Sequence, residues 1–367
     1  MITLALFVGI VYAVSLLLLA TEWKSELVNP STNSSHQSLS LLIPFRNEAD
    51  NLLRIFTSIE QLDVEHLQVV WINDHSEDYS VERLSALVEK STSRFDHLII
   101  ESKGKGKKAA LESGIQIALG EIILTTDSDC VLPRFWLQEM LHDFQNSEIQ
   151  LISGPVMTKG GDSFFYKFQQ IDWASILLVS NFSIRRGQPL MCSGANLAYR
   201  KNAFIAVNGY AGNREVASGD DEFLLKKITA KYGSSAVSYR NGLDCLVLTK
   251  PQTDWKSLFE QRVRWASKWK YHDTNHAFSS FIPAIFQLFW LSSFFLTFID
   301  FTNGLIALGI LWSLKIFSEW IALGKVLKSF KYELPIQIYL KTSLIHPFYV
   351  IYTVVKALKG KYKWKGR

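Results

Sequence analysis

The longest apolar stretches of this chain lie at its two ends, and this distribution limits the folds that are open to it. Between about Ser38 and His272 the composition is that of an ordinary soluble domain. The chain has 367 residues, of which 48% are hydrophobic and 20% are charged, so it is not disordered and can bury a sizeable core. We therefore expect a soluble domain that helices from both ends attach to a membrane.

The N-terminal segment from Leu4 to Ala20 carries no charge and is just long enough to cross a bilayer. It also resembles the core of a signal peptide, but no Lys or Arg precedes it and no small-residue cleavage pattern follows it. Trp23 suits the membrane interface. We interpret residues 1–22 as a transmembrane helix and residues 23–37 as a polar linker.

The C-terminal part, residues 273–367, contains three apolar segments. Phe281–Ile299 and Leu305–Leu323 are each long enough to span, and the turn-like residues between them predict a transmembrane hairpin over about 281–323. The second segment contains Lys315 and Glu319 on one helical face, so these two must pair or face protein. A third segment, about 334–355, includes a lysine, a histidine and a proline, and it either spans imperfectly or lies at the interface.

Basic clusters predict how the chain is oriented. Lys325, Lys328 and Lys331 follow the hairpin, and the tail after residue 355 is basic and has no acid. By the positive-inside rule both clusters are cytoplasmic, unless the tail is simply a solvated end. We then expect an integral protein of a bacterial inner membrane, with the central domain in the cytoplasm and segment 334–355 at the interface. Three cysteines without metal-type spacing fit a reducing compartment.

In the central domain, short apolar runs alternate with helix-like segments. The expected strands cover residues 39–43, 67–72, 97–100, 122–126 and 150–153, and the expected helices cover residues 48–61, 81–93, 107–119 and 134–145. This alternation predicts an α/β domain with a mostly parallel sheet and flanking helices. A further stretch, Phe164–Phe182, has apolar and aromatic residues at helical spacing, which fits core packing or a helix against the membrane near an acceptor entrance.

Polar groups follow three of the expected strands, at the edge where open sheets of this kind bind ligands. They are Arg46, Asn47 and Glu48 after the first strand, Asn73 and Asp74 after the second, and Asp127 and Asp129 after the fourth. Any one of them could simply form a turn, but three groups on one edge indicate a site. No G-x-G-x-x-G or Walker loop is present, which excludes the usual Rossmann dehydrogenases and P-loop enzymes.

Asp127 and Asp129 can share one hard divalent ion, because Mg²⁺ or Mn²⁺ takes one or two carboxylates and leaves its other positions to water and phosphate oxygens. Such a site suits a nucleotide diphosphate. Nearby, the segment "KGKGKKAALESG" opens a helix with several lysines, which either attract an anion or form an ordinary solvated face.

The order of several motifs is specific where each alone is not. "LLIPFRNE", "VVWINDHSED", "GKKAALESGIQIALGEIILTTDSDC", "SGANLAYRK", "GYAGNREVASGDDEFLLKKI" and "QRVRW" follow one another between about residues 38 and 271. In this the chain resembles membrane-bound family 2 glycosyltransferases. The resemblance implies a GT-A fold for residues 38–272, with an interfacial helix at its end, a nucleotide-sugar donor, Mg²⁺ or Mn²⁺, and inversion at the anomeric carbon.

The resemblance also implies roles for single residues. Those expected to bind the nucleotide are Pro44, Arg46, Glu48, Asp74, Lys107 and Asp127. Asp127 and Asp129 match the D-x-D pair, with Asp129 as the direct metal ligand. Many relatives have two acids after the second strand, whereas this chain has Asn73 before Asp74.

Two motifs are expected on the acceptor side. "SGDDEFL" aligns Asp221 with the catalytic base and Asp220 beside it, although acids are also favoured at a helix N-terminus without any chemistry. "QRVRW" places Gln261, Arg264 and Trp265 by the acceptor and the leaving diphosphate, although an amphipathic interfacial helix would have similar residues.

We therefore expect a hexosyltransferase that moves a sugar from a nucleotide-sugar, UDP by resemblance, to a lipid or glycan acceptor at the membrane. A subunit of a processive polysaccharide synthase is the main alternative, because protomers or a partner could complete a secretion channel. An inactive nucleotide-binding membrane adaptor and a sugar nucleotidyltransferase are weaker alternatives, since the base and "QRVRW" are both present and the first strand is followed by no glycine-rich loop. We expect no nucleic-acid partner, and the oligomeric state stays open.

Overall fold

The computed structural model describes residues 2–24, 37–216, 218–267 and 274–359. The chain divides into two compact units. The helical unit comprises Met1–Trp23, Gly160–Leu178 and Pro251–Arg367, and the sheet unit comprises Lys24–Lys159 and Val179–Lys250. These units cut across the expected boundaries at 38 and 272, because residues 160–178 and 251–267 group with the helices of the two ends.

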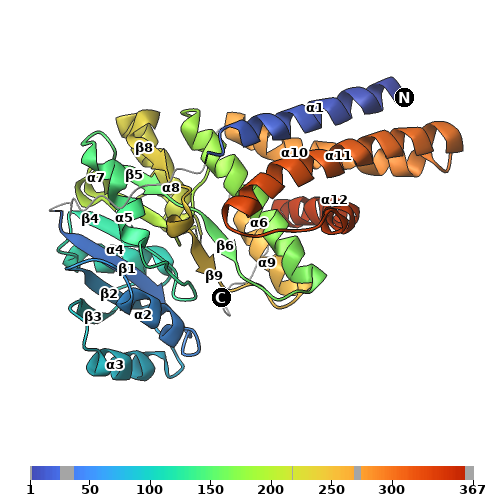
Figure 1. The fold of residues 1–367 in the computed structure, drawn as a ribbon. Coiled ribbons are helices and arrows are strands. Elements are labelled where there is room, and N and C mark those ends of the chain that lie inside the picture. Colours follow the sequence, from blue (N-terminus) through green and yellow to red (C-terminus); the bar gives the residue numbers. More distant parts are fainter. Residues whose placement is uncertain (1, 25–36, 217, 268–273, 360–367) are drawn as a thin grey trace. The chain divides into compact units, whose positions relative to one another are not determined.

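The sheet unit is built on a seven-stranded sheet with the order β3-β2-β1-β4-β7-β5-β8 (Figure 1). Its strands are β1 Leu39–Phe45, β2 Gln68–Asn73, β3 Asp96–Glu101, β4 Ile122–Thr125, β5 Leu151–Ser153, β7 Leu197–Arg200 and β8 Val237–Tyr239. Neighbouring strands are parallel except at β7, which runs antiparallel to both β4 and β5. The mostly parallel sheet is thus confirmed, with one reversed strand that the sequence did not indicate. Two short strands, β6 Val156–Thr158 and β9 Val247–Thr249, pair separately.

Strand β1 lies inside the sheet and is buried along its whole length. All seven of its residues are buried, as expected for a continuous apolar run that is covered on both faces. The strand is longer than predicted and continues to Phe45, so Pro44 lies inside it opposite Ile72 and not in the following loop. Polar groups therefore begin only at Arg46, where the strand ends.

Helices flank this sheet as the alternating pattern predicted. They are α2 Leu52–Glu60, α3 Ser80–Lys90, α4 Lys107–Ile117, α5 Trp136–Leu141, α7 Lys201–Ala206 and α8 Asp220–Tyr232. Helix α4 packs closely on β1 and β2 through Gly114, where an added Cβ would lie 2.6 Å from Ile72 Cδ1. This close approach fixes the start of α4 beside the carboxyl ends of the strands.

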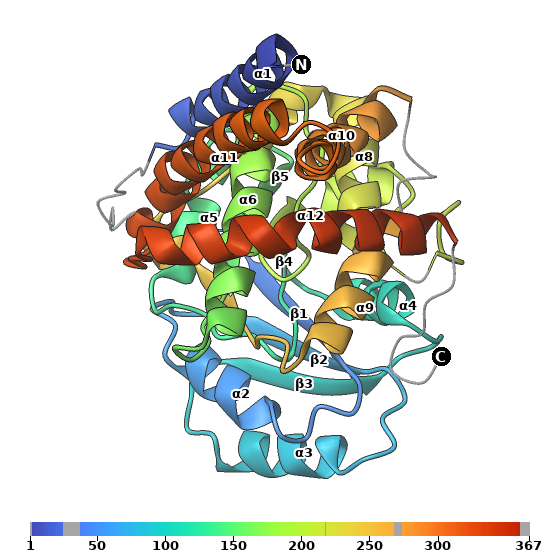
Figure 2. The same ribbon diagram turned by 90° about the vertical axis from the view of Figure 1, so that its right-hand side faces the viewer.

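The helical unit contains α1 Ile2–Thr21, most of α6 Phe164–Arg185, α9 Trp255–Ala266, α10 Thr274–Leu296, α11 Phe301–Ser329 and α12 Ile336–Leu358. Helix α1 runs along α11 in both views (Figures 1 and 2). Among the described residues, α1, α11 and α12 are long and apolar enough to cross a membrane, and Pro283–Leu296 of α10 forms a shorter apolar helix. The third apolar segment is therefore a helix of spanning length, and its interfacial position stays a prediction.

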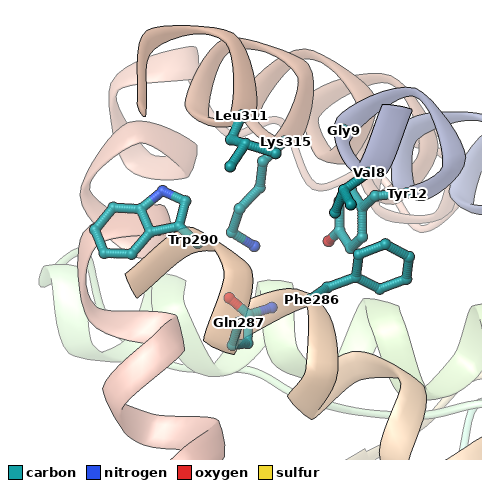
Figure 3. A pocket seen from close by; sticks show the side chains of 8 residues that line it. All are labelled: Val8, Gly9, Tyr12, Phe286, Gln287, Trp290, Leu311 and Lys315. Atoms are coloured by element: carbon teal, nitrogen blue, oxygen red, sulfur yellow. The ribbon is translucent and has the colours of Figure 1, made fainter. Parts of the chain in front are cut away.

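A polar cluster joins α1 to α11 inside this apolar unit. Lys315 pairs with Glu319, as their spacing predicted, and both side chains are buried. Tyr12 Oη donates to Glu319 Oε1 at 2.6 Å. A cavity of about 20 Å³, room for about one water molecule, lies beside them. It is lined by Val8, Gly9, Tyr12, Phe286, Gln287, Trp290, Leu311 and Lys315 (Figure 3).

Helices α6, α9 and α12 share a hydrophobic core. Phe168, Leu258 and Tyr349 are buried together, and Figure 2 shows α12 crossing α9. Phe168 is fully buried and Trp173 is 5% exposed. Core packing, one of the two interpretations of Phe164–Phe182, is thus confirmed for these two aromatic residues.

Candidate active site

Lys107 stands at the centre of the candidate site in the sheet unit. It is the first residue of α4, and its Nζ lies 2.7 Å from Asp127 Oδ1 and 3.2 Å from Asp220 Oδ2. Burial alone would lower the pKa of this lysine, but the charges of Asp127, Asp220 and Asp221 raise it above its ordinary value. The side chain therefore carries its charge at any pH at which an enzyme is assayed. The structure thus brings together three expected site residues from α4, the loop after β4, and α8.

Asp220 and Asp221 are the first two residues of α8, after Gly219 in the left-handed conformation with φ of 83°. The Asp221 carboxylate accepts hydrogen bonds from the backbone N–H of Gly194 at 2.9 Å and of Glu222 at 2.7 Å. These two donors fix the orientation of the carboxylate at the start of the helix. Asp221 thus satisfies the helix N-terminus and is also held as an oriented carboxylate, and its role as catalytic base stays a prediction.

Gly194 also lies in the candidate site, although no role was predicted for this glycine of its motif. A Cβ there would lie 2.8 Å from Asp220 Oδ2 and 3.1 Å from Lys107 Nζ, so only glycine fits without a shift. The carbonyl of Gly194 accepts from Thr125 Oγ1 at 2.7 Å, and the next carbonyl accepts from Thr126 Oγ1 at 2.9 Å. Two threonines at the end of β4 thereby fix the loop against which Asp221 rests. The glycine in "SGANLAYRK" was the available signal.

The D-x-D loop begins directly after these threonines. The Asp127 side chain is 41% exposed, and the backbone N–H of Cys130 donates to its carbonyl at 3.1 Å. Asp129 accepts from Thr249 Oγ1 of β9 at 3.3 Å. Burial, followed by the charges of Asp129 and Asp127, raises the pKa of the Cys130 thiol well above its usual value, so this cysteine stays neutral. The two carboxylates, and not this thiol, are therefore the groups of this loop that suit a cation.

These residues fit the divalent ion that the motif implies. Within the described ranges no group of three His, Cys, Asp or Glu side chains could hold a metal. Mg²⁺ and Mn²⁺ in nucleotide sites need fewer protein ligands, since phosphates and water complete the shell. Asp127 and Asp129 offer hard oxygens on one loop, and the ammonium of Lys107 at 2.7 Å shows that this loop is arranged around positive charge.

The loops after β1 and β2 contain the remaining expected nucleotide residues. Asp74 is 3% exposed, and its Oδ1 accepts from the backbone N–H of Gly106, the residue before Lys107. Arg46 donates to the Asp74 carbonyl at 3.4 Å and to Glu77 at 2.9 Å. The Glu48 carboxylate accepts from the side chain of Asn51. These contacts link the loop that carries Asp74 directly to the start of α4.

The "QRVRW" residues lie on α9, in the helical unit, whereas the acidic residues above belong to the sheet unit. Gln261, Arg264 and Trp265 are three and four residues apart, so they share one face of the helix, and all three are partly exposed. Arg262, which the sequence analysis left without a role, is buried.

Comparison with known proteins follows the same regions. Residues 40–207 match the family model described as glycosyl transferase family 2. This part of the chain therefore matches a family 2 glycosyltransferase domain. The matched range includes Asp74, Lys107, Asp127, Asp129 and Gly194, and it ends before Asp221.

Curated relatives include poly-beta-1,6-N-acetyl-D-glucosamine synthases. The protein from Staphylococcus epidermidis is 25% identical over 250 residues, which covers 65% of this chain and 56% of the relative. The protein from Staphylococcus aureus strain MSSA476 is 24% identical over 242 residues, which covers 63% of this chain and 54% of the relative. The match thus spans little more than half the length of these relatives.

Among solved structures, the mannosyltransferase PcManGT from Pyrobaculum calidifontis, in complex with GDP-Man and Mn²⁺, has a TM-score of 0.60. It is 16% identical, and the alignment covers 98% of this chain and 97% of that one. The similarity establishes a shared fold, and the expected GT-A glycosyltransferase fold is confirmed. The family 2 glycosyltransferase domain expected from the motifs is confirmed as well.

Proposed function

We propose that this protein transfers a sugar, with inversion, from a nucleotide-sugar donor to a lipid or lipid-linked acceptor at the membrane. The observation that carries the proposal is the cluster in which Lys107 bridges Asp127 and Asp220 beside Asp221. Its position at the strand ends of a family 2 glycosyltransferase domain is where a nucleotide ligand would bind.

In this proposal Asp221 is the catalytic base. The acceptor hydroxyl attacks the anomeric carbon, its proton passes to an Asp221 oxygen, and the bond from that carbon to the diphosphate breaks on the opposite face. Two backbone N–H donors hold the carboxylate in place, which favours one orientation toward an acceptor. Inversion follows from a single displacement of this kind.

On the donor side, Lys107 neutralises charge that develops on the leaving diphosphate. Asp127 and Asp129 would hold Mg²⁺ or Mn²⁺, which supplies further neutralisation of the phosphates when bound. Asp74 would contact the nucleoside. Replacing Asp129 by alanine should weaken nucleotide binding in the presence of Mn²⁺ and leave metal-free binding unchanged, and equal loss in both conditions would contradict the ligand role.

The acceptor side rests on α9 and the apolar helices. Gln261, Arg264 and Trp265 would bind the acceptor and the diphosphate, and the helices of spanning length that follow favour a substrate in the membrane. We further propose that residues 38–272 form the catalytic part in the cytoplasm and that residues 1–22 and 273–367 form the membrane part, since Lys325, Lys328 and Lys331 mark a cytoplasmic end.

A second candidate function is polysaccharide synthesis. The names of the staphylococcal relatives favour it, although the match covers little more than half of their length. The two candidates differ in product. A single transfer yields one extended lipid, whereas a synthase yields a ladder of chain lengths that an endoglycosidase shortens.

The test is nucleoside-diphosphate release by the detergent-purified protein from UDP- and GDP-sugars, with Mn²⁺ or Mg²⁺, with and without membrane lipid extract. Asp221→Asn is measured in parallel. Release from one donor that lipid stimulates and the variant lacks would support the proposal. Tight nucleotide binding without release in any condition would refute it in favour of an inactive adaptor.

A further inference from the structure

Arg262 belongs to the "QRVRW" segment, but its side chain is buried and not exposed to solvent. Only 6% of the residue is exposed, whereas its neighbours Gln261, Arg264 and Trp265 are partly exposed. A buried guanidinium needs an ion pair, because removing its charge from water is expensive. The partners of Arg262 therefore show what holds this segment in place.

Asp172 of α6 provides the ion pair. Arg262 Nε donates to Asp172 Oδ2 at 2.7 Å, and Nη2 lies 2.6 Å from the same oxygen. Tyr349 of α12 donates its hydroxyl to this oxygen at 3.1 Å. Burial alone would lower the pKa of Arg262, but the charge of Asp172 raises it, so Arg262 keeps its positive charge. Three helices are thus joined at one carboxylate.

The other side of the guanidinium faces the motif itself. Arg262 Nη1 donates to the side-chain carbonyl of Gln261. The guanidinium carbon lies 4.3 Å from the centroid of the Trp265 ring and 5.3 Å from that of Trp173. Trp265 and Trp173 also meet edge to face, with centroids 5.3 Å apart. Two of the three motif side chains therefore rest on Arg262.

This arrangement is costly if its only purpose is stability. Replacing a buried ion pair by apolar residues of similar volume is often neutral or stabilising. A guanidinium instead fixes the orientation of its partners. Its planar N–H groups donate in defined directions, and its flat face stacks on aromatic rings. Asp172 fixes the plane of the Arg262 guanidinium. That plane in turn fixes the orientation of the Trp265 ring and of the Gln261 side-chain amide.

We propose that Arg262, anchored by Asp172 and Tyr349, is the positioning residue for the acceptor-binding side chains Gln261 and Trp265. The proposal rests on the proposed glycosyl transfer, in which these two side chains contact the acceptor. Arg262 itself touches no reacting atom. It acts by holding an aromatic platform and an amide in a fixed orientation, and it ties them to α12, a helix of spanning length.

The first experiment needs no activity. Emission of Trp265 is obtained as the difference between spectra with and without Trp265→Phe, in wild-type protein and in Arg262→Gln. We expect Arg262→Gln to shift this emission to longer wavelength and to raise its quenching by acrylamide. Lys256→Gln removes the same charge from an exposed position of α9 and should change neither. An unchanged Trp265 signal in Arg262→Gln would overturn the proposal.

The second experiment separates positioning from general stability. Small misplacements of binding groups typically cost up to about 100-fold in rate, so kcat should fall about 10-fold to 100-fold and acceptor KM should rise in Arg262→Gln. Arg262→Lys should restore part of the rate, and donor affinity should stay as in wild type. Wild-type acceptor kinetics in Arg262→Gln, or parallel loss of donor affinity in both Arg262 variants, would contradict a positioning role.

Tyr349→Phe decides the matter if Arg262→Gln does not fold. It deletes one hydroxyl and should produce the same spectral shift in smaller measure, whereas no shift would count against the proposal. If wild-type protein transfers no sugar from any donor, the proposed function fails, and the Trp265 spectra still decide whether Arg262 holds this segment.

Discussion

Lys107 should affect the binding of the two ligands expected at its site in opposite directions, and this gives a sharp prediction. Its ammonium lies 2.7 Å from Asp127 Oδ1, so it attracts a diphosphate but repels a cation on the same carboxylate. Lys107→Met should therefore strengthen the binding of Mn²⁺ without nucleotide and weaken the binding of nucleoside diphosphate. A general loss of folding would weaken both.

The size of the effect follows from geometry and exposure. A Mn²⁺ ion at about 2.1 Å from Asp127 would lie roughly 4 Å from Lys107 Nζ, where two unit charges interact by about 1 kcal/mol in water. The Lys107 and Asp127 side chains are 23% and 41% exposed, so water screens this pair in part and the aqueous value is a lower bound. A divalent ion doubles it to about 2 kcal/mol, and salt screening leaves about a 10-fold gain in Mn²⁺ affinity.

The assay is titration of Mn²⁺ by electron paramagnetic resonance, with calorimetric binding of nucleoside diphosphate in parallel. Lys105→Met, an exposed lysine two residues earlier, is the matched control and should leave both affinities nearly unchanged. An Mn²⁺ affinity that is equal or weaker in Lys107→Met than in wild type would refute this electrostatic reasoning. The lysine would then have to leave Asp127 before the ion binds.

Three further outcomes are expected. Asp221→Asn should lower turnover about 100-fold to 10,000-fold while calorimetric nucleotide affinity stays nearly unchanged, and wild-type turnover would refute the base. Gly194→Ala brings a Cβ to 2.8 Å from Asp220 Oδ2, so diphosphate release should fall without a change in thermal unfolding. Lys315→Met should lower the free energy of unfolding in detergent by about 3 to 5 kcal/mol, and adding Glu319→Leu should recover most of it, whereas additive losses would contradict a coupled pair.

The sequence predicted the part of the fold that depends on apolar runs. Strands β1, β2 and β4 are buried segments whose side chains face dry surroundings on both sides, so their composition alone marks them. Parallel strands then bring their carboxyl ends to one edge, which places Asp74 and Asp127 close to the start of α4 without any knowledge of side-chain packing. Lys107 was expected near the nucleotide only by resemblance.

Short strands and distant contacts could not be predicted in this way. Strands β6 and β9 have three residues each, too few for a periodic pattern, so the contact of Thr249 with Asp129 had no signal. In the sequence, Asp172 lies 90 residues from its partner Arg262, and Tyr349 lies 177 residues from its partner Asp172. Such pairs depend on how helices cross, which a single sequence does not encode locally.

The one departure from the family pattern, Asn73 in place of an acid, has a local explanation. Its Nδ2 donates to Glu101 Oε2 at 2.7 Å, and its Oδ1 accepts from the backbone N–H of Ser76 at 2.9 Å. An aspartate could accept from Ser76 but would repel Glu101, which also lies 3.0 Å from His75 Nδ1.

The Asn73 amide thus accepts from the backbone N–H of Ser76 and donates to the Glu101 carboxylate, and both contacts hold the loop that carries Asp74. Asn73 is engaged in building this loop, and the carboxyl group at this position is that of its neighbour Asp74, which is 3% exposed. In the proposed function, nucleoside recognition at this edge rests on the Asp74 carboxyl group alone, whose Oδ1 is already fixed by the backbone N–H of Gly106. A nucleoside bound here would contact a side chain that is held by the residue before Lys107, so one continuous segment would position both the nucleoside and the diphosphate of the proposed donor.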